Sequence, residues 1–175
     1  MAERTKVWIA NVMKELMKEK PVDQIRITEL CRKAQIERPT FYYHFKDKQD
    51  VIAWIFCQEA CQTKVIDRDS AARALGGMKK DMAFYKRAYE DVSQNALWQY
   101  MLEYFAERYE TEAKRILGTD VLDPQMSFSI RLYCYGCVGM TKEWVLHDDK
   151  TSAESEVDMM YASMPEEMRS VFFGE

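Results

Sequence analysis

The chain has 175 residues, of which 47% are hydrophobic and 31% are charged. A chain of this length forms one domain, or a small domain followed by a larger one, and its apolar content suffices to bury a core. No stretch is uncharged for long enough to span a membrane, and the charged amphipathic start lacks the apolar core of a signal peptide. These features exclude a membrane-spanning protein and predict a cytoplasmic one.

The net charge of −4 is unevenly distributed along the chain. Residues 1–50 hold 11 Lys and Arg against 8 Asp and Glu, whereas residues 51–175 hold 14 against 21. A mildly basic N-terminal part ahead of an acidic body is compatible with site-specific binding to nucleic acid, and it disfavours non-specific coating of DNA.

The first predicted helix covers residues 5–19 and ends before Pro21. Its apolar side chains recur at the spacing of one helical face, so we expect this face to pack behind the next segment. These side chains are Ile9, Val12, Met13, Leu16 and Met17. Trp8 belongs either to the same core or to a contact with a nucleic-acid backbone.

Residues 27–51 predict two short helices joined by a sharp turn, the outline of a helix-turn-helix unit. Thr28 can cap the first helix. The turn is Gln35-Ile36-Glu37, with Ile36 as its apolar plug. The second helix starts near Arg38, because Pro39 is tolerated in a first helical turn.

This segment resembles the N-terminal DNA-binding domain of the TetR family of bacterial transcriptional regulators. The family pattern runs I-T-x-x-x-[IL]-x-x-x-A-G-[VI]-x-x-x-T-[FL]-Y-x-[HY]-F-x-[SND]-K-x-x-[LV]. The residues that fall on it in register are Ile27, Thr28, Leu30 or Cys31, Ala34, Ile36, Thr40, Phe41, Tyr42, His44, Phe45, Lys48 and Val51. Gln35 departs from the pattern, which has glycine there because a turn residue can need positive φ.

A recognition helix in the major groove reads bases with its first turn and holds the DNA backbone with flanking groups. Arg38 suits a guanine edge, and Thr40 suits a thymine methyl group or a phosphate. Lys48, in the first turn of the following helix, is expected to complete an anion site, whereas Phe41 and Phe45 anchor the recognition helix in the core. The resemblance implies operator contacts at several of these positions. The full set of candidate DNA-binding residues is Thr28, Arg38, Pro39, Thr40, Tyr42, Tyr43, His44, Lys46 and Lys48.

The fold class expected is all-α, with a three-helix DNA-binding domain over residues 1–48 and a helical effector-binding and dimerisation domain over residues 49–175. Asp47 can cap a long helix that runs to about Ile66, and residues 67–77, which end in two glycines, are expected to form a loop. Further helices are predicted over residues 78–92, 95–117 and 126–147, the last introduced by Asp123-Pro124, and two short helices close the chain.

The helix predicted over residues 126–147 is apolar on two faces, so it needs two surfaces to pack against. Phe128, Leu132, Tyr135 and Gly139 share one face, and Tyr133, Cys137, Met140 and Trp144 share the other. One surface is the body core, and we expect the other to be a second subunit. This pattern predicts a homodimer.

The family resemblance implies that a small molecule binds inside the helical body and changes the affinity for a pseudo-palindromic operator. Aromatic and methionine side chains at helical spacing are the candidate pocket residues, although the same pattern is typical of plain core. They are Trp54, Phe84, Trp98, Met101, Phe105, Tyr133, Met140 and Trp144. A repressor released by its ligand is the function expected.

An alternative function is suggested by the sequence of residues 40–48 and by Lys142-Glu143-Trp144-Val145. These resemble a branch of small TetR-type proteins that includes regulators of dihydroxyacetone kinase genes. Some members of that branch bind a protein co-activator in place of a ligand. An activator controlled by a protein partner is therefore the second expectation.

Five cysteines, at positions 31, 57, 61, 134 and 137, are an odd number in a chain without a secretory signal. Reduced thiols packed among apolar neighbours are expected, with a zinc site or a redox switch as alternatives. His147 with Asp148 and Asp149 suits either a helix end meeting a solvated loop or a metal or acid-base cluster. No catalytic triad order or phosphate-binding loop is present, so we expect no enzyme, no metal and no cofactor.

Overall fold

The computed structural model describes residues 2–60, 66–94, 96–148 and 150–174. Within them the chain forms ten α-helices and one 3-10 helix, η1, and no strand, so the all-α prediction is confirmed. The elements are α1 (Ala2–Glu19), η1 (Val22–Gln24), α2 (Ile27–Ala34), α3 (Arg38–His44), α4 (Lys48–Ala60), α5 (Arg68–Lys80), α6 (Met82–Glu90), α7 (Leu97–Leu117), α8 (Pro124–His147), α9 (Ala153–Ala162) and α10 (Glu166–Phe173).

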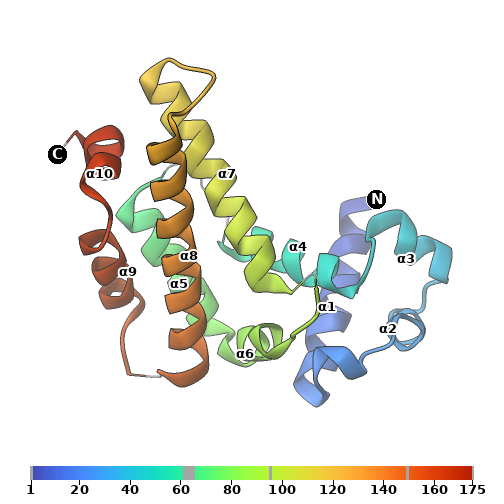
Figure 1. Cartoon of the computed structure of the whole chain (residues 1–175). Coiled ribbons are helices and arrows are strands. Elements are labelled where there is room, and N and C mark those ends of the chain that lie inside the picture. The colour runs from blue at the N-terminus through green and yellow to red at the C-terminus, as the bar shows by residue number, and fades with distance from the viewer. Residues whose placement is uncertain (1, 61–65, 95, 149, 175) are drawn as a thin grey trace.

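The first three helices form a head at one end of the molecule, and α5 to α10 form a body at the other end (Figure 1). All five apolar residues expected on the inner face of α1 are buried, which confirms the helical spacing. Trp8 was expected either in the core or at a nucleic-acid backbone, and its side chain is neither buried nor free of intramolecular contacts. Its side chain is 51% exposed, and its indole N–H donates to the carbonyl oxygen of Ala34 at 2.9 Å.

Helix α4 joins the head to the body (Figure 1). It is capped as expected, because Asp47 Oδ1 accepts from the backbone N–H of Asp50 at 2.7 Å. Val51, Ile52 and Phe56 are buried in a core that is continuous from the head into the body. The described part of α4 ends at Ala60, and its predicted continuation to Ile66 falls on residues 61–65, outside the described residues.

The loop predicted over residues 67–77 is wrong, because this segment belongs to α5. Asp67 caps the helix by accepting from the backbone N–H of Ser70 at 2.6 Å. Leu75 and Met78 are buried, and α5 packs against α4 and α9. Neither glycine of this segment is needed for space, because an added Cβ would meet nothing within 4 Å at Gly76 and only an ordinary contact, 3.5 Å from the backbone oxygen of Glu59, at Gly77. Tertiary packing therefore outweighs the low helix propensity of two glycines.

The single helix predicted over residues 78–92 is also wrong, because the chain breaks at Asp81, where φ is −124° and ψ is 44°. The later boundaries agree well with the sequence. Helix α7 ends at Gly118, which has a left-handed φ of 64°, and Asp123 caps α8 by accepting from two backbone N–H groups. None of the helices in the described ranges is long and apolar enough to cross a membrane.

Candidate nucleic-acid interface

The turn between α2 and α3 is left-handed at Gln35, with φ at 54° and ψ at 43°. Its backbone N–H donates to the carbonyl oxygen of Arg32 at 3.2 Å, and the N–H of Ile36 donates to the carbonyl of Cys31 at 3.0 Å. Ile36 packs against the core, as a plug between two helices should. Positive φ explains why the family pattern has glycine at this position, and Gln35 adopts it at a cost in backbone strain.

Helix α3 is held from one side by two aromatic anchors. Phe41 is fully buried and Phe45 is 2% exposed, and their ring centroids lie 6.1 Å apart. Pro39 occupies the first turn, where its missing N–H leaves no intrahelical bond unmade. Burying these two phenylalanines turns the opposite face of α3 outward.

The outward face of α3 carries the candidate base-reading and phosphate-binding groups. Arg38, Pro39 and Tyr42 are exposed, and Tyr43 is 80% exposed. The guanidinium carbon of Arg38 lies 5.9 Å from the ring centroid of Tyr42, a cation–π distance that holds the side chain over the helix start. Arg38 can therefore offer its paired N–H groups to a base edge from a restrained position.

The remaining candidates of this region border the same face. Thr40 and His44 are partly buried, and the His44 ring meets that of Tyr43 edge to face at 4.9 Å. Lys46 is exposed, and its backbone N–H donates to Asp50 Oδ2 at 2.9 Å, which fixes the chain between α3 and α4.

Lys48 does not form the expected anion site. Its ammonium group donates to the backbone oxygens of Val22, Asp23 and Ile25, at 2.6, 3.2 and 3.0 Å. An ammonium group has three N–H donors, so these three carbonyls use all of them. Lys48 instead ties the start of α4 to η1 and to Ile25, the residue that ends η1.

Thr28 does not cap α2, because the helix starts one residue earlier and Arg26 stands at its N-cap without a side-chain hydrogen bond. Thr28 is exposed and borders an open polar recess, which Arg26, Arg32 and Lys20 also line. Lys20 is partly neutralised by Glu29, at 2.7 Å, and this hydrogen bond lowers the pKa of the Glu29 carboxyl.

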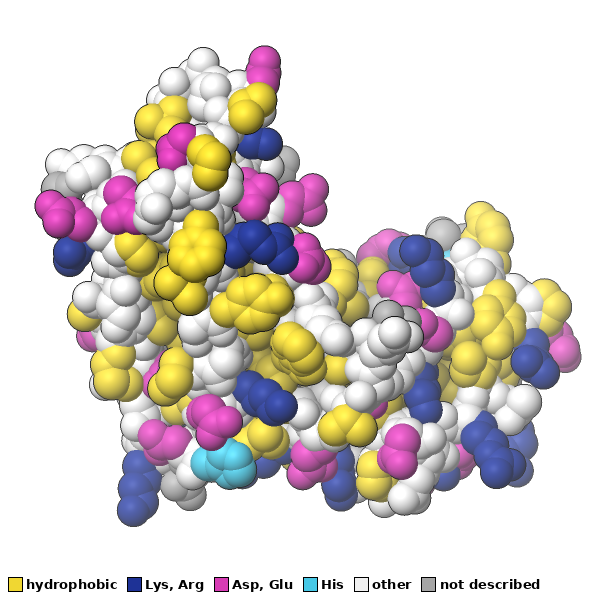
Figure 2. All heavy atoms as spheres, viewed as in Figure 1, with side chains coloured by type: hydrophobic (Ala, Val, Ile, Leu, Met, Phe, Trp, Pro, Cys, Tyr) yellow, Lys and Arg dark blue, Asp and Glu magenta, His cyan; other side chains and the backbone are white. Residues whose placement is uncertain are grey.

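Sequence reasoning missed Arg26 and Arg32 as possible phosphate contacts. Their spacing of six residues, with Glu29 between them, gives no clear one-face pattern. The signal lies in their position, since Arg26 is the N-cap residue of the helix before the recognition helix and Arg32 lies in the last turn of that helix. In Figure 2 several Lys and Arg side chains are visible over the head.

The body contains a cavity of about 110 Å³, surrounded by α4, α5, α7, α8 and α9. Of the eight candidate pocket residues, Met101, Phe105 and Tyr133 line it. The α5 residues that complete its wall include Ala71 and Leu75, which were missed because residues 67–77 were expected to be a loop.

The other five candidates do not line the cavity, because each side chain packs or is exposed elsewhere. Trp54 packs edge to face on Phe45 in the head, and Phe84 lies beneath the ammonium of Lys14. Trp98 bridges the two buried clusters. Trp144 is buried and donates from its indole N–H to the carbonyl of Thr151 at 3.0 Å, whereas Met140 is 54% exposed on the outer face of α8.

The polar groups around the cavity are mostly paired within the protein. The Tyr133 hydroxyl donates to the carbonyl of Met160 at 3.1 Å, and the Thr141 hydroxyl donates to that of Cys137 at 2.8 Å. Burial raises the pKa of Cys134 to about 12 and that of Cys137 to about 11. These thiols are therefore protonated near neutral pH, which makes them poor nucleophiles.

The described cysteines are all free, and Cys61 lies outside the described residues. In the ranges that the structure covers, no group of three or more His, Cys, Asp or Glu is placed to hold a metal ion. His147 lies at the end of α8, 3.8 Å from Glu143 on the same helix.

Comparison with known proteins decides the family. A profile described as the C-terminal region of transcriptional regulators (TetR_C_8) matches residues 69–166, and one for bacterial regulatory proteins of the tetR family matches residues 11–54. The chain belongs to the TetR family. It is a DNA-binding transcriptional regulator, and its helix-turn-helix lies where the sequence pattern placed it.

One curated relative of this TetR-family chain is the HTH-type dhaKLM operon transcriptional activator DhaS from Lactococcus lactis subsp. lactis (strain IL1403). The two are 35% identical over 48 residues, which cover 27% of this chain and 26% of the relative. The match thus spans about a quarter of that protein's length.

Solved structures share the fold over most of the chain. The dihydroxyacetone kinase operon activator DhaS has a TM-score of 0.60 and 20% identity, covering 91% of this chain and 96% of that one. A tetR-family regulator from Streptomyces coelicolor has a TM-score of 0.56 and 14% identity, with 97% and 87% covered. NalD of Pseudomonas aeruginosa, the secondary repressor of the MexAB-OprM multidrug efflux pump, has a TM-score of 0.53 and 17% identity, with 94% and 98% covered.

Proposed function

We propose that this TetR-family protein binds a pseudo-palindromic operator as a homodimer, with one α3 helix in each of two successive major grooves. The observation that carries the proposal is the division of α3 into two faces. Phe41 and Phe45 are buried, and Arg38, Tyr42 and Tyr43 point outward. A short helix anchored in this way presents its first turn and its polar aromatic tips to a groove.

The proposal assigns roles to the residues of the head. Arg38 and Thr40 read bases, because they lie in or beside the first turn of α3. The phosphate contacts come from Thr28, Tyr42, Tyr43, His44 and Lys46, together with Arg26 and Arg32. Pro39 packs along the groove, and Lys48 positions the head without touching DNA, since its three N–H donors are used.

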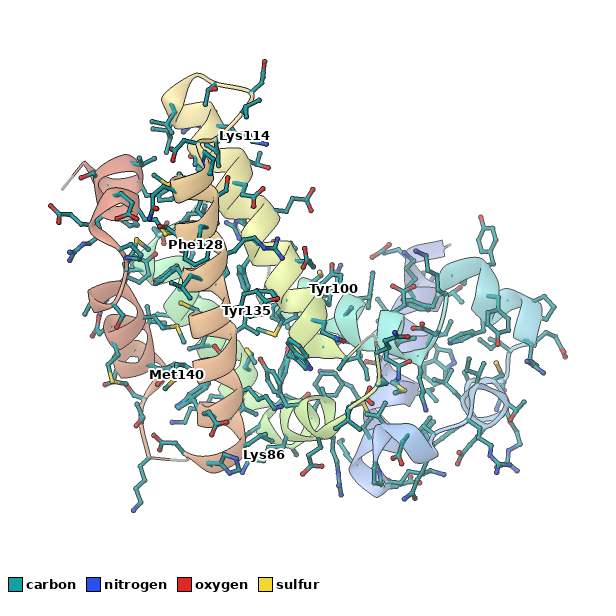
Figure 3. The ribbon with its side chains drawn as sticks, viewed as in Figure 1. Lys86, Tyr100, Lys114, Phe128, Tyr135 and Met140 are labelled. Atoms are coloured by element: carbon teal, nitrogen blue, oxygen red, sulfur yellow. The ribbon has the colours of Figure 1, made fainter. Side chains whose placement is uncertain are left out.

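The homodimer is supported by an uncovered apolar stripe on α8. Phe128, Leu132 and Tyr135 are 63%, 58% and 53% exposed, and their spacing of four and three residues keeps them on one helical face. Met140 is also exposed, but it lies about 120° round the helix from Phe128 and is not part of this stripe. Figure 3 labels two members of the stripe, Phe128 and Tyr135, on α8, and Figure 2 shows hydrophobic side chains gathered there and over α7. A contiguous exposed patch of this kind marks an interaction surface.

A second copy of the chain is the occupant that fits best. A cyclic dimer uses the same patch twice, so a self-complementary apolar stripe with a polar margin suits it. The margin includes the ion pair of Arg131 with Glu103, at 3.2 Å. At Gly136 and Gly139 an added Cβ would meet nothing within 4 Å, so a partner backbone has room to approach. Pairing would give two heads, which an operator requires about 34 Å apart.

The control of DNA binding has two candidate mechanisms. The cavity of about 110 Å³ in the body favours a small, largely apolar effector whose binding releases the protein from its operator, which would make the protein a repressor. The resemblance of the head to the activator DhaS favours the alternative of an activator, with a protein partner in place of a ligand. We propose repression as the first candidate, in the cytoplasm and without enzymatic activity.

Selection of bound sequences from random duplex DNA tests the proposal. We expect enrichment of two inverted half-sites with a fixed centre-to-centre spacing near one helical turn or a small multiple of it. Enrichment of a single half-site would overturn the dimer, and no enrichment at any salt concentration would overturn operator binding. With the selected operator, release by small apolar compounds but not by protein fractions would separate the two mechanisms of control.

A further inference from the structure

A three-way ionic contact joins the head to the body at Lys14. This lysine lies on α1, and its ammonium group contacts a carboxylate oxygen of Glu59 on α4 and Asp81 Oδ2 at 2.7 Å. Asp81 lies at the break between α5 and α6. One cation from the head thus bridges two anions, one on α4 and one at the junction of α5 and α6.

The surroundings restrain this contact further. Glu59 Oε2 accepts from the Tyr85 hydroxyl at 2.9 Å, and the Tyr85 ring is fully buried in the core. The ammonium of Lys14 also lies 5.2 Å from the ring centroid of Phe84. The three charged side chains are only 21%, 32% and 33% exposed, so water screens them less than at an open surface.

Lys14 is charged in this setting. Its burial by itself lowers the pKa, but the hydrogen bonds to Asp81 and Glu59 outweigh burial and raise the pKa overall. Two further charged side chains of α1 interact with the site: Glu15 with Asp81, and Lys18 with both Asp81 and Lys14. The raised pKa therefore keeps the Lys14 ammonium positively charged near neutral pH.

The two carboxylates stand beside the wall of the body cavity. Glu59 directly precedes Ala60 and follows Phe56 by three residues, and both of these line the cavity. Asp81 follows Met78 by three residues, and Met78 lines the same cavity. A displacement of α4 or α5 at the cavity wall therefore moves a carboxylate that holds Lys14.

We infer that Lys14 is a positioning residue that fixes the orientation of the DNA-binding head on the body, and that Glu59 and Asp81 couple the packing of the cavity to that orientation. Apolar helix contacts slide past one another at little cost, whereas charge-assisted hydrogen bonds hold a defined geometry. The inference rests on the proposed operator-binding dimer, because head orientation matters where two heads must meet two half-sites.

The test measures how much the operator affinity depends on the spacing between the two half-sites. The parent protein is compared with Lys14→Met, which keeps the aliphatic stem, on the selected operator and on versions with one base pair added to or removed from the spacer. We expect the parent to lose at least about tenfold in affinity on the altered spacers, because a fixed head cannot follow them. Lys14→Met should lose less than about threefold, while both proteins discriminate bases within one half-site equally.

Matched variants keep the test decisive. Lys18→Met removes a lysine from the same helix whose partner is the exposed Glu15, and it should behave as the parent. Lys14→Arg preserves the charge and should restore the spacing preference. If Lys14→Met does not fold, Glu59→Gln with Asp81→Asn removes the anions at nearly constant volume. A spacing preference equal to the parent's in every folded variant would overturn the inference.

A cavity-filling substitution tests the coupling to the cavity. Ala74 lines the cavity, and Ala74→Leu inserts an apolar group without any ligand. We expect Ala74→Leu to change operator affinity by at least about threefold in the parent and by much less in the Lys14→Met background. An equal response in the two backgrounds, including none in either, would overturn the coupling. Failure of the parent itself to bind any duplex would instead overturn the proposed function.

Discussion

The head and the body of this protein differ in how far their apolar side chains are buried. In the head, Ile9, Met13, Leu30, Phe41 and Phe45 are at most 2% exposed, and the helices cover one another's apolar faces. In the body, α8 buries one face and leaves a row of apolar side chains exposed on the other. The apolar faces of the head helices are therefore covered within the chain, by one another and by the core that continues through α4 into the body, whereas the exposed face of α8 is where we propose a partner surface.

The same contrast holds for internal space. The body contains a partly open cavity of about 110 Å³ with mainly apolar walls, whereas the recess on the head is more open and is lined by polar residues. A tightly packed head keeps its reading surface rigid, and a body with unfilled volume can change its packing when a molecule enters. The proposed sites of recognition and of regulation thus lie in regions of different packing.

The largest expected effect comes from opening the packed core of the head. Phe41→Ala should lower the free energy of unfolding by about 3–5 kcal/mol, because the fully buried ring leaves a cavity among fixed neighbours. Tyr43→Ala, two residues along the same helix and 80% exposed there, should change it by less than about 0.5 kcal/mol. Urea unfolding of both variants measures the difference. Similar losses would mean that the head is not packed as described.

The next effect tests the incomplete face of the body. Leu132→Glu places a carboxylate in the middle of the α8 stripe, and desolvating it in both subunits should dissociate the dimer. We expect operator affinity to fall at least about 100-fold, equivalent to about 2.7 kcal/mol. Sedimentation velocity reports the oligomeric state, and fluorescence anisotropy reports the affinity.

Met159→Glu is the matched control for that substitution. Met159 is 53% exposed on α9, away from the stripe on α8, so a carboxylate there should leave the dimer and the affinity unchanged. A dimer that survives Leu132→Glu but not Met159→Glu would transfer the interface to α9.

A smaller effect distinguishes the two kinds of contact on α3. Arg38→Ala should relax base preference by about 1–3 kcal/mol at one operator position, whereas Tyr42→Ala should weaken binding about equally across sequences. The two side chains stack at 5.9 Å, so their effects should not add fully. Binding to a set of single-base operator variants measures both. An unchanged base profile for Arg38→Ala would assign base reading to another residue.

Much of the fold was predictable because local signals and tertiary packing agree. Apolar spacing identified α1, and the residues Gly118, Asp123 and Pro124 marked the end of α7 and the start of α8. Helix α5 was missed because its two glycines are a strong local signal against a helix, whereas its stability comes from packing against α4 and α9, which local sequence does not show.

The candidate sites were predictable to different degrees for a similar reason. The outward residues of α3 follow from a motif of fixed spacing. The intramolecular role of Lys48 depends on where η1 places three carbonyl groups, and a motif carries no information about that. Periodicity also cannot separate a cavity wall from solid core, so Met101, Phe105 and Tyr133 were found beside five candidates that lie elsewhere.

The smallest expected effect concerns the single strained turn of the head. Gln35 is, in the described ranges, the residue other than glycine that has positive φ, and its side chain is exposed. Gln35→Gly should raise the free energy of unfolding by about 0.5–1 kcal/mol, because relief of the left-handed strain exceeds the added flexibility of the unfolded chain. Gly118→Ala is the reciprocal control, since its φ of 64° is nearly the same and the substitution should lower stability by about 1 kcal/mol. Thermal unfolding of both variants measures opposite shifts of about 2–4 °C per kcal/mol. Destabilisation by Gln35→Gly would instead show that contacts of the glutamine side chain stabilise the turn, at a position where the family pattern has glycine.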